Sequence, residues 1–178
     1  MLNPHQRGDE RGARAIDAPS EPDADLPHGG REASRFRMVA TVHLVLQRGD
    51  QILMLRRWQT GWADGCYSLP AGHVDGGEPV RAAAAREAYE ECGVTIPAAP
   101  GGLSLMGVMH RRSDREQMDF FFRAQAWSGE PYNREPEKCD HLGWFPRHSL
   151  PPNTVSYVRR ALWEPSAAPW LLEYGWEG

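Results

Sequence analysis

The segment from Pro79 to Cys92 restricts the fold more than any other part of the sequence, because it carries both a start signal and a stop signal for a helix. The segment is rich in alanine, Glu78 stands at the expected N-cap, Pro79 takes the first helical position, and Gly93 follows the expected last turn. Proline is tolerated at that first position, and glycine is favoured just beyond a helix end. The sequence therefore predicts a helix over residues 79–92.

Three acidic residues within this helix point to a metal site. Glu87, Glu90 and Glu91 are spaced i, i+3, i+4, so their carboxylates project from one helical face and repel one another. Arg86 can pair with Glu90 but cannot neutralise three carboxylates. Mg²⁺ can, because it binds carboxylate oxygens and keeps positions for waters and phosphates. A solvated acidic face is the alternative, but the glycine-bearing loop 72–77 just before the helix favours a metal-phosphate site.

The wider pattern resembles the Nudix box, G-x5-E-x7-R-E-U-x-E-E-x-G-U, where U is aliphatic. Its defined positions are occupied here by Gly72, Glu78, Arg86, Glu87, Ala88, Glu90, Glu91, Gly93 and Val94. Ala88 is the smallest residue that the aliphatic position admits. The resemblance implies an α/β fold, an α/β/α sandwich with a mixed β-sheet, and hydrolysis of a nucleoside diphosphate linked to another group.

The resemblance also implies roles for the residues of the box. Glu87, Glu90 and Glu91 would ligate Mg²⁺, or Mn²⁺ in its place, together with the backbone carbonyl of Ala71. Arg86 would orient the glutamates rather than touch substrate.

The general base is left open by the sequence. Members of the family differ, and often recruit an acid from a distant loop; here the segment 129–138 lies between two expected strands and contains three glutamates. Glu137, or else Glu135, could activate water from this loop. Glu90 and Glu91 are rivals for the same role.

Substrate-binding residues are marked less clearly. Gly72 and His73 at the start of the box could contact phosphate, and Glu78 is either a substrate contact or an acid favoured by the helix dipole. Arg56 and Arg57 alternate faces of a strand, so only one can reach the site, and we select Arg56 for a substrate phosphate. Three aromatic residues could stack on a base or belong to the core: Trp58, Trp62 and Tyr67.

The remaining elements are predicted from apolar runs and turn signals. Residues 38–46 and 51–55 are expected to form a β-hairpin. Further strands are expected over residues 66–69, 104–110, 118–127 and 142–145, and a last helix over residues 154–163. We expect a disordered N-terminal tail over 1–35, a Nudix hydrolase domain over 36–165 and a C-terminal tail over 166–178, which packs back on the core.

Composition bounds the function. The 20 basic and 24 acidic residues leave a net charge of −4 and a pI near 6.0, which excludes the basic field of a general nucleic-acid binder. Three cysteines without C-x-x-C spacing argue against a disulfide framework. No run of about 18 apolar residues is found. We therefore expect a cytoplasmic protein with no membrane or stable nucleic-acid partner, as a monomer or homodimer. A small nucleotide substrate is what the resemblance to the Nudix box implies.

The resemblance leaves several activities in competition. The leading hypothesis is hydrolysis of a nucleoside triphosphate to the monophosphate and pyrophosphate. ADP-ribose or another nucleoside diphosphate sugar is the alternative substrate. A non-catalytic nucleotide-binding module and an isoprenoid diphosphate isomerase using Cys66 are the other options; the complete set of box glutamates argues against both.

Overall fold

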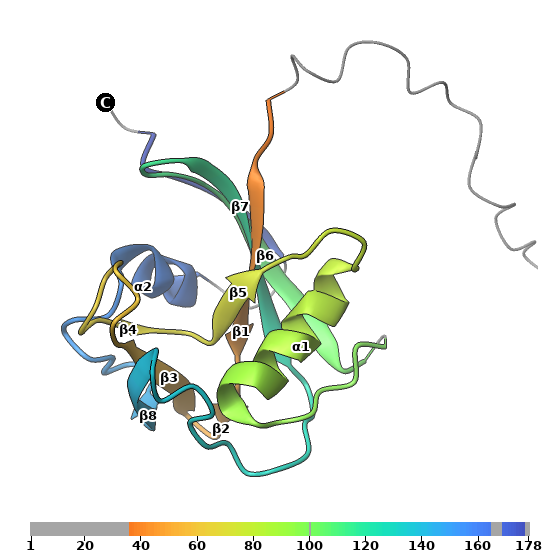
Figure 1. The fold of residues 1–178 in the computed structure, drawn as a ribbon, viewed down its shortest axis with the longest axis vertical. Helices are drawn as coiled ribbons and strands as arrows, with labels where there is room; N and C mark the ends of the chain where they lie inside the picture. The colour runs from red at the N-terminus through yellow and green to blue at the C-terminus, as the bar shows by residue number, and fades with distance from the viewer. Residues whose placement is uncertain (1–35, 100, 165–168, 177–178) are drawn as a thin grey trace, which may run out of the picture. The chain divides into compact units, whose positions relative to one another are not determined.

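The computed structural model describes residues 36–99, 101–164 and 169–176, and the tail expected over residues 1–35 lies outside them. The helices and strands of these described residues all lie within one unit, residues 37–178. In chain order they are β1 Val39–Val45, β2 Gln47–Arg48, β3 Gln51–Arg57, β4 Tyr67–Ser68, β5 Ala71–His73, α1 Val80–Cys92, β6 Leu103–Arg112, β7 Glu116–Ala124, β8 Cys139–Pro146, α2 Ser156–Trp163 and β9 Trp170–Tyr174 (Figure 1).

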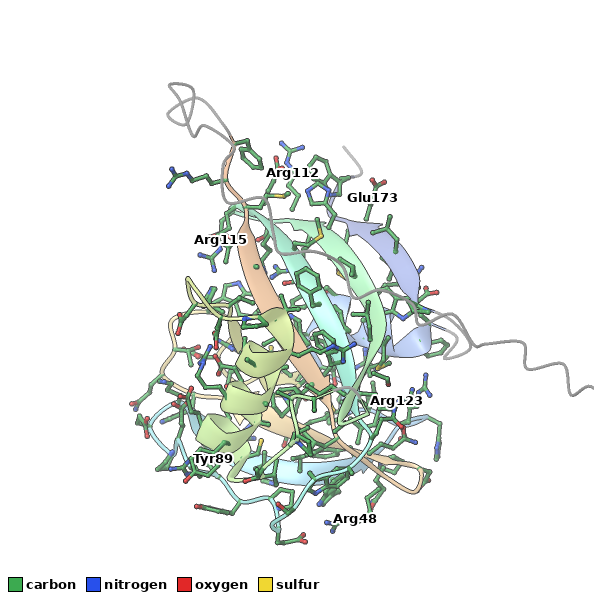
Figure 2. All side chains as sticks on the ribbon, turned by 90° about the vertical axis from the view of Figure 1, so that its right-hand side faces the viewer. Arg48, Tyr89, Arg112, Arg115, Arg123 and Glu173 are labelled. Carbon is green, nitrogen blue, oxygen red and sulfur yellow. The ribbon has the colours of Figure 1, made fainter. Side chains whose placement is uncertain are left out.

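The strands form two sheets. The larger sheet has the order β5-β1-β7-β6-β9, with β1–β7 and β6–β9 parallel and the other pairs antiparallel. The expected mixed sheet is thereby confirmed. The smaller sheet is antiparallel: β3 lies at its centre and pairs with β2, β4 and β8. Figure 2 shows Arg112 and Arg115 at one end of the long β6–β7 pair and Arg123 at the other.

The hairpin expected from residues 38–46 and 51–55 is formed only next to the turn. There the amide of Leu53 donates to the carbonyl of Leu46 at 3.0 Å, and the two-residue β2 pairs with β3. The rest of the expected first arm, β1, lies in the other sheet. Strand β1 is paired on both sides, with β5 and with β7, so it has no free edge to offer β3. The short loop after β1 predicts only that the chain reverses. The sheet to which β1 belongs is decided by its pairing with strands that are distant in the sequence.

The larger sheet is covered on both faces. Small residues of α1, including Ala84 and Ala88, pack in one buried cluster with Leu44 and Phe122. Phe121 points to the opposite face, where it packs in a second cluster with residues of α2. Successive residues of a strand face opposite sides of a sheet, so β7 contributes to both cores. The result is the helix-sheet-helix layering that the sequence predicts.

Helix α1 begins one residue later than expected. Pro79, not Glu78, is the N-cap, and its carbonyl accepts hydrogen bonds from the amides of Ala82 and Ala83. Glu78 instead turns its side chain toward the loop before the helix. The expected stop at Gly93 is confirmed, since this residue adopts the left-handed conformation with φ of 71°.

The expected C-terminal tail, residues 166–178, contributes a strand. Within residues 169–176, which the structure describes, β9 pairs in parallel with β6 at the edge of the larger sheet. Trp170 covers Gly107, where a Cβ atom would overlap the indole, and its ring lies 5.3 Å from that of Phe121. Neither helix of the described residues is long and apolar enough to cross a membrane.

Candidate active site

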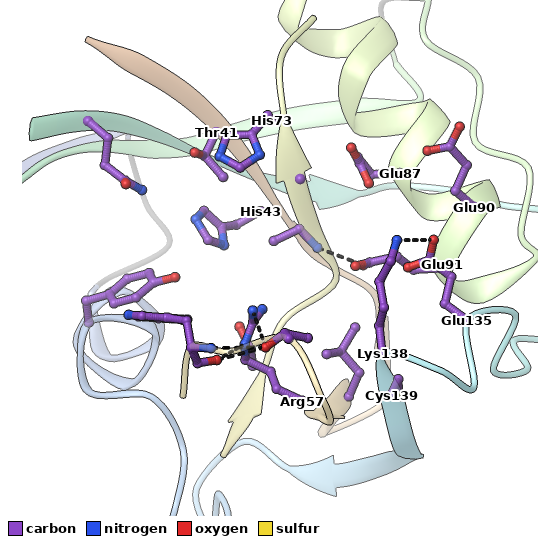
Figure 3. Close-up of a pocket in the computed structure, with 18 of the residues that line it drawn as sticks. Thr41, His43, Arg57, His73, Glu87, Glu90, Glu91, Glu135, Lys138 and Cys139 are labelled. Carbon is purple, nitrogen blue, oxygen red and sulfur yellow. Dashed lines mark hydrogen bonds and ion pairs between the residues drawn. The ribbon is translucent and has the colours of Figure 1, made fainter. Parts of the chain in front are cut away.

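A cavity of about 630 Å³ lies where β5 runs along the edge of the larger sheet. Its walls come from α1, from strands β1 and β3–β7, from the loops after β3, β5 and β6, from the start of β8 with the loop before it, and from one residue of α2. In Figure 3 the labelled glutamates lie to one side of β5, and Thr41 and His43 to the other. The cavity therefore has an acidic wall and a second wall of different chemistry.

The acidic wall is built by the spacing of the glutamates on α1. Glu87, Glu90 and Glu91 all line the cavity. Their exposure differs: the Glu87 side chain is 12% exposed, and that of Glu90 is 47% exposed. Burial raises the pKa of Glu87.

Glu91 lacks the arginine partner that Glu87 and Glu90 have. Its Oε2 accepts a hydrogen bond of 2.9 Å from the amide of Ala71, and it makes no ion pair with any described residue. Burial of the carboxyl group, with Glu87 and Glu135 nearby, raises the pKa of Glu91 to about 8. Any cation that enters the cavity would stabilise the charged form of this carboxyl group.

Arg86 connects the residues of the box through hydrogen bonds. Its Nη1 donates to Glu87 at 2.8 Å and to Glu90 at 3.0 Å, and its Nη2 donates to Glu78 at 2.6 Å and to the carbonyl of His73 at 2.9 Å. One guanidinium thus fixes two carboxylates of the acidic wall relative to the loop before the helix. Glu78 lies outside the cavity wall and contacts Arg86, so its predicted contact with substrate is not supported by this geometry.

Gly72 is required by the close approach of β5 to α1. A Cβ atom at this position would overlap the carboxyl group of Glu87. Gly72, Ala71 and His73 all line the cavity, and His73 Nε2 lies 3.1 Å from a guanidinium nitrogen of Arg115. The loop therefore brings backbone groups next to the acidic wall, as a site for a metal and its phosphate ligands needs.

The acidic wall fits a hard cation by its donor chemistry. Four carboxylates line it, from Glu87, Glu90, Glu91 and Glu135, against the charges of Arg86 and Lys138. In the described part of the chain, no group of three or more Asp, Glu, His or Cys side chains has the geometry of a preformed metal site. Excess carboxylate and the weakly compensated Glu91 are what make the wall suitable for Mg²⁺.

The predicted loop acid is corrected by the structure. Glu137 is exposed and lies outside the cavity wall, whereas Glu135 lines it and accepts a hydrogen bond of 2.8 Å from Lys138. The loop turns here, because the amides of Lys138 and Cys139 both bond to the carbonyl of Glu135. That turn, which the sequence does not specify, decides which glutamate faces inward.

The predicted arginine is corrected in the same way. Arg56 is held by Asp140 through two hydrogen bonds of 2.7 and 2.9 Å and lies outside the cavity wall. Arg57 lines the cavity, with its guanidinium 4.9 Å from the centre of the Trp62 ring. The pairing of β3 with β8 shifts register between the two arginines. Trp62 shares the wall with Arg57, while Trp58 lies outside it.

The second wall contains residues that the sequence analysis missed. Four of them are buried polar side chains of the larger sheet: Thr41 and His43 of β1, Arg111 of β6 and Gln117 of β7. Thr41 and Gln117 are each followed two residues later by another buried polar side chain, so each pair shares one strand face. The sequence signal that could have predicted this wall is the placement of polar residues at every second position within otherwise apolar strands.

Asp119 is at the centre of this wall's hydrogen bonds. It is fully buried, accepts from Arg111 at 2.6 Å and from Gln117 at 2.7 Å, and has His43 Nε2 at 3.4 Å. Burial alone would raise the pKa of Asp119, but His43 and Arg111 outweigh it and lower the value to about 2. Thr41 Oγ1 and both ring nitrogens of His43 have no hydrogen-bond partner within the described residues.

Comparisons with known proteins identify the domain. A family model described as NUDIX domain matches residues 36–167. The NAD-capped RNA hydrolase NudC of Pseudomonas aeruginosa is 31% identical over 116 residues, 65% of this chain and 39% of that protein. An RNA pyrophosphohydrolase of Rhizobium meliloti is 31% identical over 57% of this chain and 71% of its own length.

Solved structures give the same result. The crystal structure of a MutT NUDIX hydrolase from Burkholderia pseudomallei superimposes with a TM-score of 0.65 and 30% sequence identity. The match covers 71% of this chain and 97% of that one. The chain thus spans nearly the whole of this structure, but only about two fifths of the NudC protein.

Proposed function

The chain belongs to the Nudix family of hydrolases, and from this premise we propose that it cleaves the diphosphate linkage of a small nucleotide in a Mg²⁺-dependent reaction. The observation that carries the proposal is the cavity with an acidic wall on one side of β5 and polar and cationic groups on the other. A nucleoside di- or triphosphate with its metal ion has the complementary charge distribution.

Glu87, Glu90 and Glu91, with the backbone carbonyl of Ala71, would hold the metal ion. When bound, Mg²⁺ supplies charge stabilisation at phosphorus and acidifies a bound water. Arg86 keeps two of the three carboxylates in place through its hydrogen bonds.

Glu135 is the residue we propose as general base. It reaches the cavity from the loop before β8 and lies close enough to Glu91 to influence its pKa. Its carboxylate would accept the proton of the attacking water, and the ammonium of Lys138 orients one of its oxygens.

The second wall would bind the rest of the substrate. Arg57 lines the cavity and makes no ion pair with a described carboxylate, so its charge is available to a phosphate oxygen. His73 lines the cavity beside Arg115 and would contact another phosphate oxygen. Thr41 Oγ1 and His43 Nδ1, which have no hydrogen-bond partner among the described residues, would form hydrogen bonds with the nucleoside portion, because buried polar groups are normally paired.

We propose a nucleoside triphosphate, cut to the monophosphate and pyrophosphate, as the leading substrate. The likeness to a MutT NUDIX hydrolase over 97% of that chain supports a compact substrate. The relative named NAD-capped RNA hydrolase favours a second candidate, the free dinucleotide NAD, whose central diphosphate offers the same bond. ADP-ribose presents that bond as well.

A substrate panel tests the proposal. The purified chain would be incubated with Mg²⁺ and nucleoside triphosphates, NAD, ADP-ribose or a nucleoside diphosphate sugar, and the products separated by chromatography. We expect monophosphate and pyrophosphate from a triphosphate, loss of activity in EDTA, and recovery with excess Mg²⁺. Hydrolysis of NAD or ADP-ribose alone would replace the leading substrate. Full activity in EDTA, or no cleavage of any diphosphate, would overturn the proposal.

A further inference from the structure

The loop that carries Glu135 is bonded to the C-terminal end of α1. The amide of Tyr132 donates to the carbonyl of Cys92 at 3.0 Å, and the amide of Arg134 donates to the carbonyl of Glu91 at 3.1 Å. The last carbonyls of a helix have no partner within the helix itself. The loop therefore satisfies two of these acceptors in the same turn that contributes Glu90 and Glu91 to the acidic wall.

Arg134 strengthens this attachment with its side chain. Its Nη1 donates to the carbonyl of Tyr89 at 2.7 Å, and its guanidinium lies 4.2 Å from the centre of the Tyr89 ring. The last turn of α1 contains no basic residue of its own. Arg134 supplies a positive charge where the helix dipole favours one, from a position 45 residues later in the chain.

The same contacts fix the position of Glu135, the residue that follows Arg134. Asn133 precedes Arg134 in the chain. Its side chain accepts a hydrogen bond from the amide of Glu135 at 3.1 Å and donates to the carbonyl of Cys139 at 2.6 Å. The loop is thus held at both ends: by α1 before Glu135 and by the start of β8 after it. Tyr89 is exposed, and Figure 2 shows it on the outer side of α1, so the contact is outside the cavity.

We propose that Arg134 is a positioning residue, which acts through Glu135 by holding the loop on the last turn of α1, with Tyr89 as its support. The inference rests on the proposed function, because it needs Glu135 to act on the water. A residue that holds a catalytic group in place affects turnover rather than substrate affinity, since the substrate does not touch it.

A double-mutant cycle tests this role. The variants Arg134→Ala, Glu135→Gln and the combination would be assayed with Mg²⁺ and ATP, or with NAD if the panel shows that ATP is not cleaved. We expect Arg134→Ala to lower kcat about 10-fold with KM within about twofold, and to change kcat less than about twofold in the Glu135→Gln background. Arg134→Lys should restore part of the loss, because it keeps the charge and one donor.

The chain offers a matched control in Arg48. This arginine also lies over an aromatic ring, Trp144 at 4.6 Å, and binds the same loop through Glu130. Arg48→Ala should leave kcat within about twofold of the wild type, since Glu130 is five residues from Glu135. Equal losses from Arg134→Ala in both backgrounds, no loss at all, or a change in KM alone would overturn the proposal.

Two further measurements keep the inference testable. If Arg134→Ala does not fold, Tyr89→Leu removes the supporting ring while leaving the carbonyl, and kcat should fall about threefold, again only when Glu135 is present. Hydrogen exchange of the wild-type amides of Tyr132 and Arg134 reports on the attachment without any activity. Protected amides in a protein that cleaves nothing would refute the proposed function alone, whereas unprotected amides would refute the attachment.

Discussion

Glu91 and Asp119 are two enclosed carboxylates beside the same cavity, and their surroundings are opposite. Asp119 is held by Arg111, Gln117 and His43, and its pKa is lowered to about 2. Glu91 has one backbone amide as donor, and its pKa is raised to about 8. The first carboxylate is compensated by the protein itself, and the second is left for a ligand to compensate.

The difference separates a structural charge from a functional one. A buried carboxylate that is fully paired holds its neighbours in place and gains little from further ligands. A buried carboxyl group without a paired cation keeps its proton near neutral pH, and a metal ion that binds there stabilises the charged form in its place. The wall around Asp119 is therefore expected to be rigid in the free protein, and the wall around Glu91 to be completed by Mg²⁺.

The largest expected effect is on activity. Glu91→Gln keeps an oxygen for the amide of Ala71 but removes the charge, so we expect kcat/KM to fall about 10³-fold while the melting temperature stays the same or rises. Steady-state assays and thermal denaturation would measure both. Activity within tenfold of the wild type would show that Glu91 is not a metal ligand.

Asp119→Asn should mainly affect stability. The substitution keeps the size of the side chain but leaves Arg111 buried without its counter-charge, and we expect a loss of about 3 kcal/mol in the free energy of unfolding. Urea denaturation would measure it. Asp140→Asn breaks the more exposed pair with Arg56 and should destabilise the fold much less, because solvent screens that pair. Equal losses in the two variants would remove the distinction between the buried and the exposed pair.

The pH dependence of stability should also separate the two carboxylates. Without metal, folded Glu91 keeps a proton up to about pH 8 that the unfolded chain releases near its ordinary pKa of 4.5. Its contribution is therefore present below pH 4.5 and lost as the pH rises toward 8. Asp119 behaves in the opposite sense, and its contribution is lost only as the pH falls below about 4.

Between pH 5 and 8 in EDTA we therefore expect the free energy of unfolding to fall by roughly 2 kcal/mol, allowing for water that reaches Glu91 from the cavity. Urea denaturation at a series of pH values would measure this. Glu91→Gln should remove most of the slope, and Mg²⁺ should reduce it. A wild-type stability that rises over this range would contradict the assignment.

The smallest expected effect concerns the neighbouring arginines of β3. Arg57→Gln removes a charge from the cavity wall, and we expect kcat/KM to fall about tenfold, mainly through KM. Arg56→Gln breaks the pair with Asp140 outside the cavity and should change kcat/KM less than about twofold. Steady-state kinetics of the two variants make the comparison, and a larger effect at Arg56 would reverse the assignment.

Local patterns explain why much of the fold and half of the site could be predicted. Helix α1, its end at Gly93 and the common face of its three glutamates follow from a repeat of 3.6 residues per turn, which depends only on neighbours in the chain. Most of the strands were found within a few residues of their positions. The pairing of β1 was not predicted, because the loop after β1 does not encode the choice among distant partner strands.

The sequence by itself determined that an α-helix with three glutamates on one face follows a glycine-bearing loop, and this is the pattern that resembles the Nudix box. Only the tertiary structure decided that Glu135 rather than Glu137, and Arg57 rather than Arg56, reach the cavity, and that Asp119 is neutralised by Arg111. Helical spacing is fixed by bonds between residues four apart. The direction of a loop or strand side chain is instead fixed by contacts with segments tens of residues away.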